Sequence, residues 1–354
     1  MAGEGPAADL THDGSATDHL SMDVLLPRSL EEALELAAAN PEVVPIAGGT
    51  DVMVELNMDH GRPETLMDIS RLTELGGWRR EDGHLFLGAG VTYTRIMREL
   101  PEHTALVQAS RSVGSPQIRN RGTVGGNLGT GSPAGDALPV LAAWDAEVIL
   151  ARAGGSTRSV PWREYLTGVK RTAREPAELI LGARWRVPRG PGSFSKIGTR
   201  NAMVIAVANL CLQMDEDGRS VRVALGSVAP TVVRAEPAET FAAQAFADAR
   251  LWDDPRATLG PDVAERFGEL VADAANPIDD VRGTGAYRRH AVGVVARRAR
   301  GMRTRARRPA RPSTSRTPPA RTRSSNRGAR DARGAGRAGS NPARRRSPAT
   351  RRSR

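Results

Sequence analysis

The stretch RNRGTVGGNLGTGSPAGDALP, from Arg119 to Pro139, combines closely spaced glycines with hydroxyl and amide side chains. The apolar run VLAAW begins directly behind it. A segment of this composition between helical patterns is either a slack surface connection or a loop that cradles a ligand. Taken alone, the stretch leaves both interpretations open, because glycine and serine serve either purpose.

A second glycine pair lies upstream, in PIAGGTDV from Pro45 to Val52, and it resembles the segment TVGGN from Thr123 to Asn127. Glycines let the backbone approach a ligand closely, and successive N–H groups in such turns form an anion nest. The upstream loop also precedes a helix, whose start we expect at Thr50 or Asp51. We therefore predict two loops suited to a diphosphate, although two ordinary tight turns would give the same pattern.

Helical and strand patterns follow one another along the chain without strict alternation. Ser29 and Glu32 form a capping box for a helix with an apolar face. Strands are predicted in TLMDIS, HLFLG and SVRVALGSVAP, and helices within residues 240–275 and 287–298. Residues 194–214 are expected to form a strand, a polar turn and a long apolar run. The mixture predicts an α+β body in two parts, with a boundary near Phe194.

Arginine is concentrated in the last part of the chain. Residues 301–354 contain 18 arginines and one acidic residue, Asp331, so their charge is +17, whereas the whole chain carries +11. Residues 1–300 are therefore mildly acidic at −6, which argues against nucleic-acid binding by the body. The composition of the tail predicts disorder. Its role stays open between a polyphosphate-binding arm and unrelated sequence created by a frameshift.

Cysteine use and hydropathy restrict the compartment and the chemistry. Cys211 is the single cysteine and lies in the apolar run AMVIAVANLCLQM, so we predict a buried thiol. One cysteine supports neither an internal disulfide nor an iron–sulfur cluster. Residues 1–20 are predicted to be a disordered leader, and no window approaches the ~18 apolar residues of a membrane helix. We expect a cytoplasmic protein.

The motifs of several enzyme classes are absent. The chain has no P-loop and no H-E-x-x-H, and its six histidines lack the spacing of metal ligands. The segment GAGVTY, from Gly88 to Tyr93, lacks the last glycine of a dinucleotide fingerprint, and no G-x-S-x-G elbow occurs. We therefore predict no catalytic residue and no metal site, and expect a bound cofactor to supply the chemistry.

Six segments in a fixed order carry a family resemblance: IAGGTD, LGAGVT, SPQIRNRGTVGGNLGTGSPAGD, KIGTRNAMVIAV, LGSVAP and PIDDVRGTGAYRRH. Together they resemble the FAD-binding medium subunit of the xanthine dehydrogenase, molybdopterin dehydrogenase and carbon monoxide dehydrogenase family. The resemblance implies a two-lobed, PCMH-type FAD-binding domain over residues 21–193. A smaller α+β C-terminal domain over residues 194–300 and the disordered tail would follow.

The resemblance also implies which residues contact FAD. The first loop would wrap the diphosphate with Pro45, Ile46, Ala47, Gly48, Gly49, Thr50, Asp51 and Val52. The second would contact it from the other side with Thr123, Val124, Gly125, Gly126 and Asn127. Asp136 is implied near the ribose or adenosine, Ile180 as an apolar contact, and Lys196 near the flavin. From the residues alone, Lys196 is equally a solvated charge at a strand end, and Asp136 a helix N-cap.

One substitution tests the second loop. Valine in place of Gly125 or Gly126 is predicted to abolish FAD binding, because the side chain would occupy the space of the diphosphate. Normal flavin stoichiometry in either variant would refute this assignment.

The function implied by the resemblance is electron transfer in a molybdenum hydroxylase. A molybdopterin-binding large subunit would hydroxylate the substrate, and a small subunit would carry the 2Fe-2S clusters. This chain would pass electrons from those clusters through non-covalently bound FAD to NAD. The loops look most similar to the xanthine dehydrogenase branch; carbon monoxide and aromatic-acid dehydrogenases stay open. So do an FAD oxidase that acts alone and an Arg-tailed nucleic-acid-binding or regulatory protein.

Overall fold

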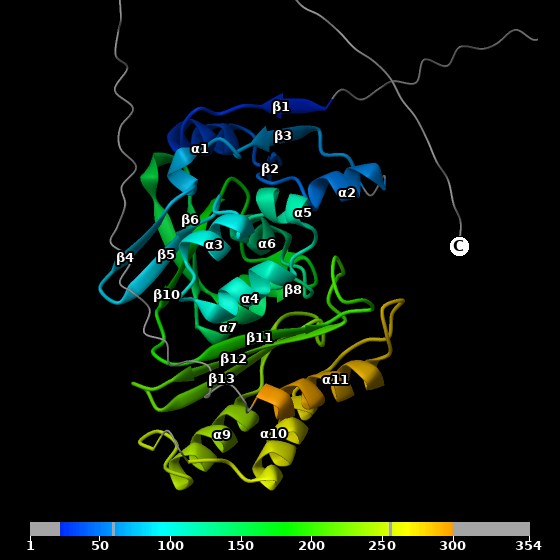
Figure 1. The fold of residues 1–354 in the computed structure, drawn as a ribbon. Helices are drawn as coiled ribbons and strands as arrows, with labels where there is room; N and C mark the ends of the chain where they lie inside the picture. The colour runs from blue at the N-terminus through cyan, green and yellow to red at the C-terminus, as the bar shows by residue number, and fades with distance from the viewer. Residues whose placement is uncertain (1–21, 59–60, 255–256, 300–354) are drawn as a thin grey trace, which may run out of the picture. The chain divides into compact units, whose positions relative to one another are not determined.

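The computed structural model describes residues 22–58, 61–254 and 257–299 of the chain. The predicted leader 1–20 and the Arg-rich tail 301–354 lie outside these residues. The described strands form three larger sheets (Figure 1). The buried apolar residues form three core clusters, one with each sheet. The predicted α+β class is confirmed.

The N-terminal lobe is a three-stranded parallel sheet in the order β1-β3-β2. Its elements are β1 (Asp23–Leu25), α1 (Leu30–Ala39), β2 (Val44–Ile46), α2 (Val52–Asn57) and β3 (Thr65–Asp68). Half of the predicted capping box is confirmed, since the Ser29 hydroxyl accepts a hydrogen bond from the Glu32 N–H at 3.1 Å. The Glu32 carboxylate, however, accepts from the Arg28 N–H at 2.6 Å and not from that of Ser29. The face of α1 that holds Ala33, Leu34 and Ala37 is buried in the core of this lobe.

The second lobe is a five-stranded antiparallel sheet in the order β4-β5-β10-β6-β7. Its strands are β4 (Trp78–Glu81), β5 (His84–Gly88), β6 (Glu147–Ala151), β7 (Thr157–Pro161) and β10 (Leu179–Arg186). Its helices are α3 (Tyr93–Glu99), α4 (Thr104–Ser112), α5 (Pro116–Arg121), α6 (Val124–Thr130), α7 (Ala137–Ala143) and α8 (Trp162–Tyr165). A small hairpin, β8 (Leu166–Gly168) and β9 (Arg171–Thr172), follows α8.

The glycine-rich stretch contains a helix, α6, where the sequence predicted a loop. Thr123 is its N-cap, and its hydroxyl accepts a hydrogen bond from the Gly126 N–H at 2.9 Å. Glycine is a poor helix former, but the burial of Val124 and Leu128 in the core of the second lobe offsets its unfavourable helix propensity. The TVGGN segment is therefore the first turn of a helix.

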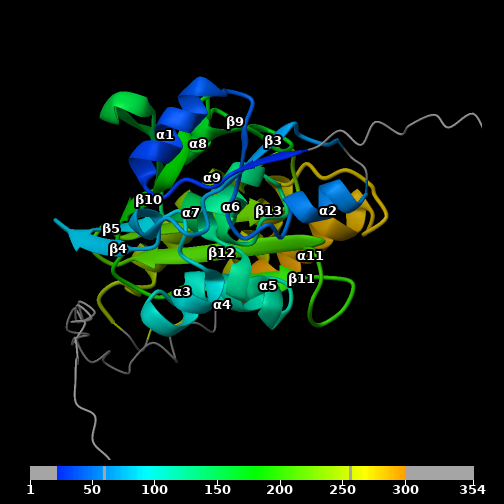
Figure 2. The same ribbon diagram turned by 90° about the horizontal axis from the view of Figure 1, so that it is seen from above.

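The C-terminal part is a four-stranded antiparallel sheet in the order β11-β12-β13-β14. Its elements are β11 (Gly192–Ile197), β12 (Ala208–Asp215), β13 (Ser220–Gly226), β14 (Val233–Arg234), α9 (Glu236–Asp248), α10 (Pro261–Asp273) and α11 (Gly285–Arg298). Helices α9 and α11 contact one face of the sheet, and α4 and α7 of the second lobe contact the other (Figures 1 and 2). The boundary that we predict between residues 193 and 194 falls within β11 and stays a proposal.

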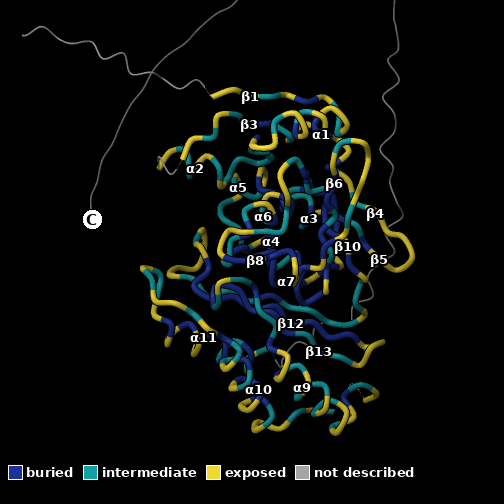
Figure 3. Tube along the Cα trace, turned by 180° about the vertical axis from the view of Figure 1, so that it is seen from behind, coloured by how far each residue is buried: buried dark blue, intermediate teal, exposed yellow. Residues whose placement is uncertain are grey.

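Strand β12 is buried along its whole length because helices cover both faces of its sheet (Figure 3). Cys211 in this strand is completely buried, as predicted, and burial raises the pKa of its thiol. The predicted apolar run, however, is not one element. The chain first forms a loop in which Met203 and Ile205 are exposed, and β12 begins only at Ala208.

Candidate functional site

A cavity of about 610 Å³ lies between the N-terminal lobe, helices α5 and α6, and the loop that joins β11 to β12. Every predicted site residue except Val124 lines it: Pro45, Ile46, Ala47, Gly48, Gly49, Thr50, Asp51, Val52, Thr123, Gly125, Gly126, Asn127, Asp136, Ile180 and Lys196. The side chain of Val124 is buried in the second core, on the protein side of α6. Segments far apart in the sequence therefore meet at one cavity.

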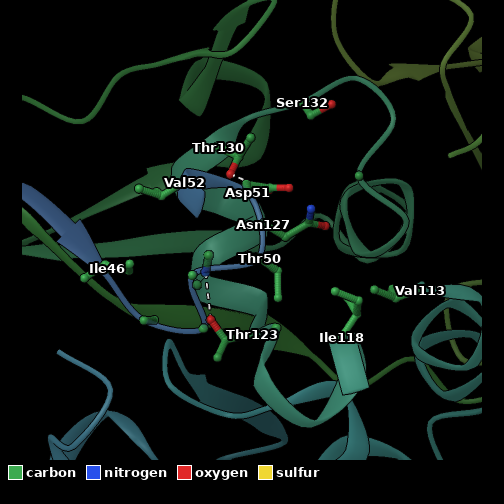
Figure 4. A pocket seen from close by; sticks show the side chains of 18 of the residues that line it. Ile46, Thr50, Asp51, Val52, Val113, Ile118, Thr123, Asn127, Thr130 and Ser132 are labelled. Atoms are coloured by element: carbon green, nitrogen blue, oxygen red, sulfur yellow. Dashed lines mark hydrogen bonds between the residues drawn. The ribbon is translucent and has the colours of Figure 1, made fainter. Parts of the chain in front are cut away.

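The loop between β2 and α2 lines this cavity with residues 47–52. The N–H groups of residues 47–52 have no hydrogen-bond partner among the residues that the structure describes. Asp51 is the N-cap of α2, but its side chain does not cap the helix; its carboxylate accepts a hydrogen bond from the Thr130 hydroxyl at 2.8 Å (Figure 4). A run of free N–H groups at a helix start is the environment that binds an anion such as a diphosphate.

The two glycine segments are in direct contact at Gly48. A Cβ at this position would lie 2.1 Å from the carbonyl oxygen of Arg121 and 3.0 Å from the nitrogen of Gly122. No side chain fits in that space, so the β2–α2 loop reaches the start of α6 only with glycine here. Both predicted diphosphate loops thereby share one wall of the cavity.

The paired glycines of α6 have different surroundings, which corrects one of our predictions. A Cβ at Gly125 would lie 2.4 Å from the Cβ of Ala89 and 2.5 Å from its carbonyl oxygen, so it would strike the protein and not the diphosphate space. A Cβ at Gly126 would meet only the Thr123 hydroxyl, at 3.2 Å, and Gly126 is exposed.

Gly126→Val should therefore weaken FAD binding at least tenfold at an unfolding temperature near that of the wild type, because its side chain faces open cavity space. Gly125→Val should instead lower the unfolding temperature, since it forces α6 away from Ala89. Thermal unfolding and FAD titration of both variants separate the two effects. A Gly126→Val protein with unchanged FAD affinity would contradict this placement.

Lys196 and Asp136 form a buried ion pair at the wall of the cavity. The Lys196 ammonium lies 2.6 Å from the Asp136 carboxylate, and the two side chains are 10% and 4% exposed. The same carboxylate accepts hydrogen bonds from the Ser112 hydroxyl at 3.0 Å and the Asn209 amide at 3.3 Å. Burial raises the pKa of Asp136, and the Lys196 ammonium opposes that shift.

This pair changes the interpretation of both residues. Asp136 is the N-cap residue of α7 by position, but its side chain makes no capping bond. Lys196 is not a solvated strand end, since it is largely buried and its Nζ also donates to the Ser112 carbonyl at 3.1 Å. The pair links β11 to the start of α7 and brings a cation to the cavity wall in a charge-compensated form.

Sequence reasoning missed an apolar part of the lining. Val113 and Ile118 lie side by side at the cavity (Figure 4), and Gly114 lies between them in sequence. The Arg119 guanidinium donates to the carbonyls of Val113 and Gly114 at 3.0 and 2.8 Å, which fixes this turn. Arg119, from the opening stretch, had no predicted role. In the sequence, only the family motif SPQIRN indicated that this region contributes to the site.

Two further segments border the cavity. Met203, Val204 and Ile205 come from the β11–β12 loop. Lys170, at the tip of the β8–β9 hairpin, binds Glu55 of α2 at 2.6 Å, so the hairpin and the N-terminal lobe are joined across the lining. Both side chains of this ion pair are about half exposed, which makes its contribution to stability small.

The residues present fit FAD. Free N–H groups in the β2–α2 loop match a diphosphate, and the apolar side chains of Ile46, Val113 and Ile180 match the faces of planar rings. In the described part of the chain, no three metal-ligating side chains come together. Nor does any helix of that part have the length and apolar character to cross a membrane.

Two family models match the chain. Residues 20–189 match the FAD binding domain in molybdopterin dehydrogenase, and residues 193–301 match the CO dehydrogenase flavoprotein C-terminal domain. The first match contains all of the predicted cavity residues except Lys196, which lies in the second.

Individual proteins show the same similarity. The nicotinate dehydrogenase FAD-subunit of Eubacterium barkeri is 35% identical over 204 residues, which cover 54% of this chain and 69% of the relative. The xanthine dehydrogenase FAD-binding subunit of Escherichia coli O157:H7 is 29% identical over 285 residues, with 76% and 91% covered. Among solved structures, a carbon monoxide dehydrogenase from Hydrogenophaga pseudoflava aligns with a TM-score of 0.69 at 26% identity, over 80% of this chain and 97% of that one.

Proposed function

Because the chain belongs to the family of FAD-binding subunits of the molybdenum hydroxylases, we propose that it binds FAD in the cavity between its lobes and relays electrons in a xanthine dehydrogenase-like complex. The observation that carries this proposal is the β2–α2 loop, whose N–H groups at residues 47–52 are free within the described structure and which lines the cavity beside the second glycine segment. The sixteen residues that the resemblance implies are proposed as the FAD site on this basis, with Val124 acting through the packing of α6.

The protein's own residues have distinct tasks in this proposal. The β2–α2 loop and the start of α6 would hold the diphosphate, and Gly48 lets them approach each other. Val113, Ile118 and Ile180 would exclude water from the rings. The ion pair of Lys196 and Asp136 would fix β11 against α7 and keep a cation beside the ligand. Bound FAD would supply the redox chemistry, by coupling one-electron donors to a two-electron acceptor.

Partners and acceptor form the finer part of the proposal. Cys211 alone cannot hold an iron–sulfur cluster, which supports a separate small subunit with 2Fe-2S clusters and a large molybdopterin-binding subunit. The similarity to a xanthine dehydrogenase subunit supports a heterocycle such as xanthine as the substrate that the complex oxidises. NAD as the acceptor is a prediction from the family resemblance. The cytoplasmic location stays a prediction.

Co-purification followed by a turnover assay tests this assembly. We expect a tagged chain to retain both the large and the small partner subunit, and the complex to reduce NAD when it is given xanthine. Turnover with carbon monoxide or nicotinate but not with xanthine would move the proposal to another branch of the family. A chain that purifies alone and reduces oxygen with its own substrate would contradict it and favour a self-sufficient oxidase.

A further inference from the structure

The last family segment, PIDDVRGTGAYRRH from Pro277 to His290, contributes no residue to the cavity lining. It forms a tight turn followed by α11. The backbones of Asp280 and Gly283 exchange two hydrogen bonds, at 3.2 and 3.1 Å, which close the turn. The segment therefore has a defined shape without an evident part in binding FAD.

Asp280 is the centre of this turn because it binds two arginines. The Arg282 guanidinium donates to one carboxylate oxygen through Nε at 3.0 Å and Nη2 at 2.6 Å. Arg288 binds the other oxygen through Nη2. Arg288 is 1% exposed, and its Nη1 donates to the Ser227 carbonyl at 2.7 Å. The turn is thus fixed to the end of the C-terminal sheet by a partly buried, charge-assisted network in which Arg288 is the buried member.

Arg282 makes one more contact, which lies outside this network. Its Nη1 donates to the Ala206 carbonyl at 3.2 Å, at the end of the loop formed by residues 198–206. The base of that loop is closed by the Val207 N–H, which donates to the Ile197 carbonyl at 2.8 Å. Across residues 22–58, 61–254 and 257–299, no other hydrogen bond ties loop 198–206 to a segment outside the β11–β12 hairpin.

The same loop forms a wall of the cavity. Met203, Val204 and Ile205 line it, directly after the strand that carries Lys196. Met203 and Ile205 are 54% and 64% exposed, so packing does little to hold this wall in place. Ala206 is fully buried, and its carbonyl would lose its partner if the guanidinium were removed.

We propose that Arg282 is a positioning residue for the FAD site: braced by Asp280 and Arg288, it holds loop 198–206 in place as a wall of the cavity. The identity of the ligand rests on the proposed function, whereas the coupling between the turn and the loop does not. The family segment in the C-terminal part thereby acquires a role in the site that forms between the lobes.

Trypsin cleavage of the FAD-free full chain tests the coupling. Arg200 is exposed within the loop, so opening of the loop is read from the rate of the cut after Arg200, followed by mass spectrometry. Arg282→Ala should raise this rate about tenfold, as expected for a lost hydrogen bond from a charged donor. Arg289→Ala is the matched control, because Arg289 also donates to one carbonyl, that of Ala275 at 3.2 Å, but does not touch the loop.

FAD release from the loaded chain tests the consequence. Arg282→Ala should release FAD about tenfold faster than the wild type and Arg289→Ala at the wild-type rate. If Arg282→Ala does not fold, Arg282→Lys serves instead, because an ammonium presents its donors from one atom and does not reproduce the forked contact of the guanidinium with Asp280 and the Ala206 carbonyl. Unchanged cleavage, or faster cleavage with unchanged release, would overturn the proposal. If the wild type binds no FAD, the proposed function fails while the cleavage rates still decide the coupling.

Discussion

Gly48→Ala is expected to weaken FAD binding by roughly 100-fold, or about 2.7 kcal/mol, while the three cores stay folded. The added Cβ would lie 2.1 Å from the Arg121 carbonyl oxygen, a backbone atom that cannot rotate away. The β2–α2 loop must therefore withdraw from the start of α6, and the free N–H groups of residues 47–52 move with it. The dissociation constant for FAD, measured by titration of the apoprotein, reports this displacement.

Gly77→Ala is the matched control for this prediction. A Cβ at Gly77 would meet nothing within 4 Å, and the residue lies outside the cavity lining. Both variants should keep the far-ultraviolet circular dichroism of the wild type. If Gly48→Ala bound FAD as tightly as Gly77→Ala, the contact between the two glycine segments would have no part in the FAD site.

Lys196→Met is expected to lower the free energy of unfolding by about 3–5 kcal/mol, because it leaves the Asp136 carboxylate buried without its cation. Removing one partner of a buried ion pair costs more than removing both. The double variant Lys196→Met with Asp136→Asn should therefore recover part of the loss. Denaturant titration of the two variants and the wild type measures both differences.

The loss in Lys196→Met should also depend on pH. Burial raises the pKa of Asp136, and without Lys196 no cation opposes that shift. The folded state then binds a proton that the unfolded state releases above its ordinary carboxyl pKa. The stability of the variant consequently falls as the pH rises from the pKa of Asp136 in the unfolded state toward its raised pKa in the folded state. The variant should therefore be closer to the wild type at pH 4 than at pH 7. An equal loss at both values would contradict a buried, unpaired carboxylate.

Features set by neighbouring residues were predictable from the sequence. The cap that Ser29 forms with the Glu32 N–H lies within one helical turn, although the Glu32 carboxylate accepts from the Arg28 N–H and not from that of Ser29. The helix start at Asp51 follows from a glycine turn and an apolar run. The family segments, taken in order, predicted the class of fold and the residues that would meet at a common cavity. The alternation of β13 likewise marked a strand, because its pattern depends on local spacing alone.

The conformation of the opening stretch depended on contacts that its own sequence does not contain. Glycine-rich VGGNLGT forms α6 because Ala89 accepts Gly125 at close range and because the second core buries Val124 and Leu128. Those partners lie in other elements, so the low helix propensity of glycine alone predicts a loop. For the same reason, the sequence did not distinguish Gly125, which packs against Ala89, from Gly126, which is exposed.

Long-range pairing also decided the roles of the charged residues. Asp136 and Lys196 were each assigned to different parts of FAD, and nothing in their local sequence indicates that they bind each other. Ser112 and Asn209 complete the same site from α4 and β12. Residues 202–214 are mostly apolar, but they form an exposed loop followed by a buried strand. The sequence does not distinguish the two, because apolar residues that line a cavity and apolar residues in a core give the same pattern.

The visible absorption spectrum of the purified chain tests directly whether the cavity binds FAD. We expect a yellow protein with flavin absorbance, about one FAD per chain after reconstitution, and full release of the flavin on acid precipitation, because no histidine or cysteine of the described residues lines the cavity. A folded but colourless protein that binds no added FAD would contradict the assignment of the cavity and the function built on it.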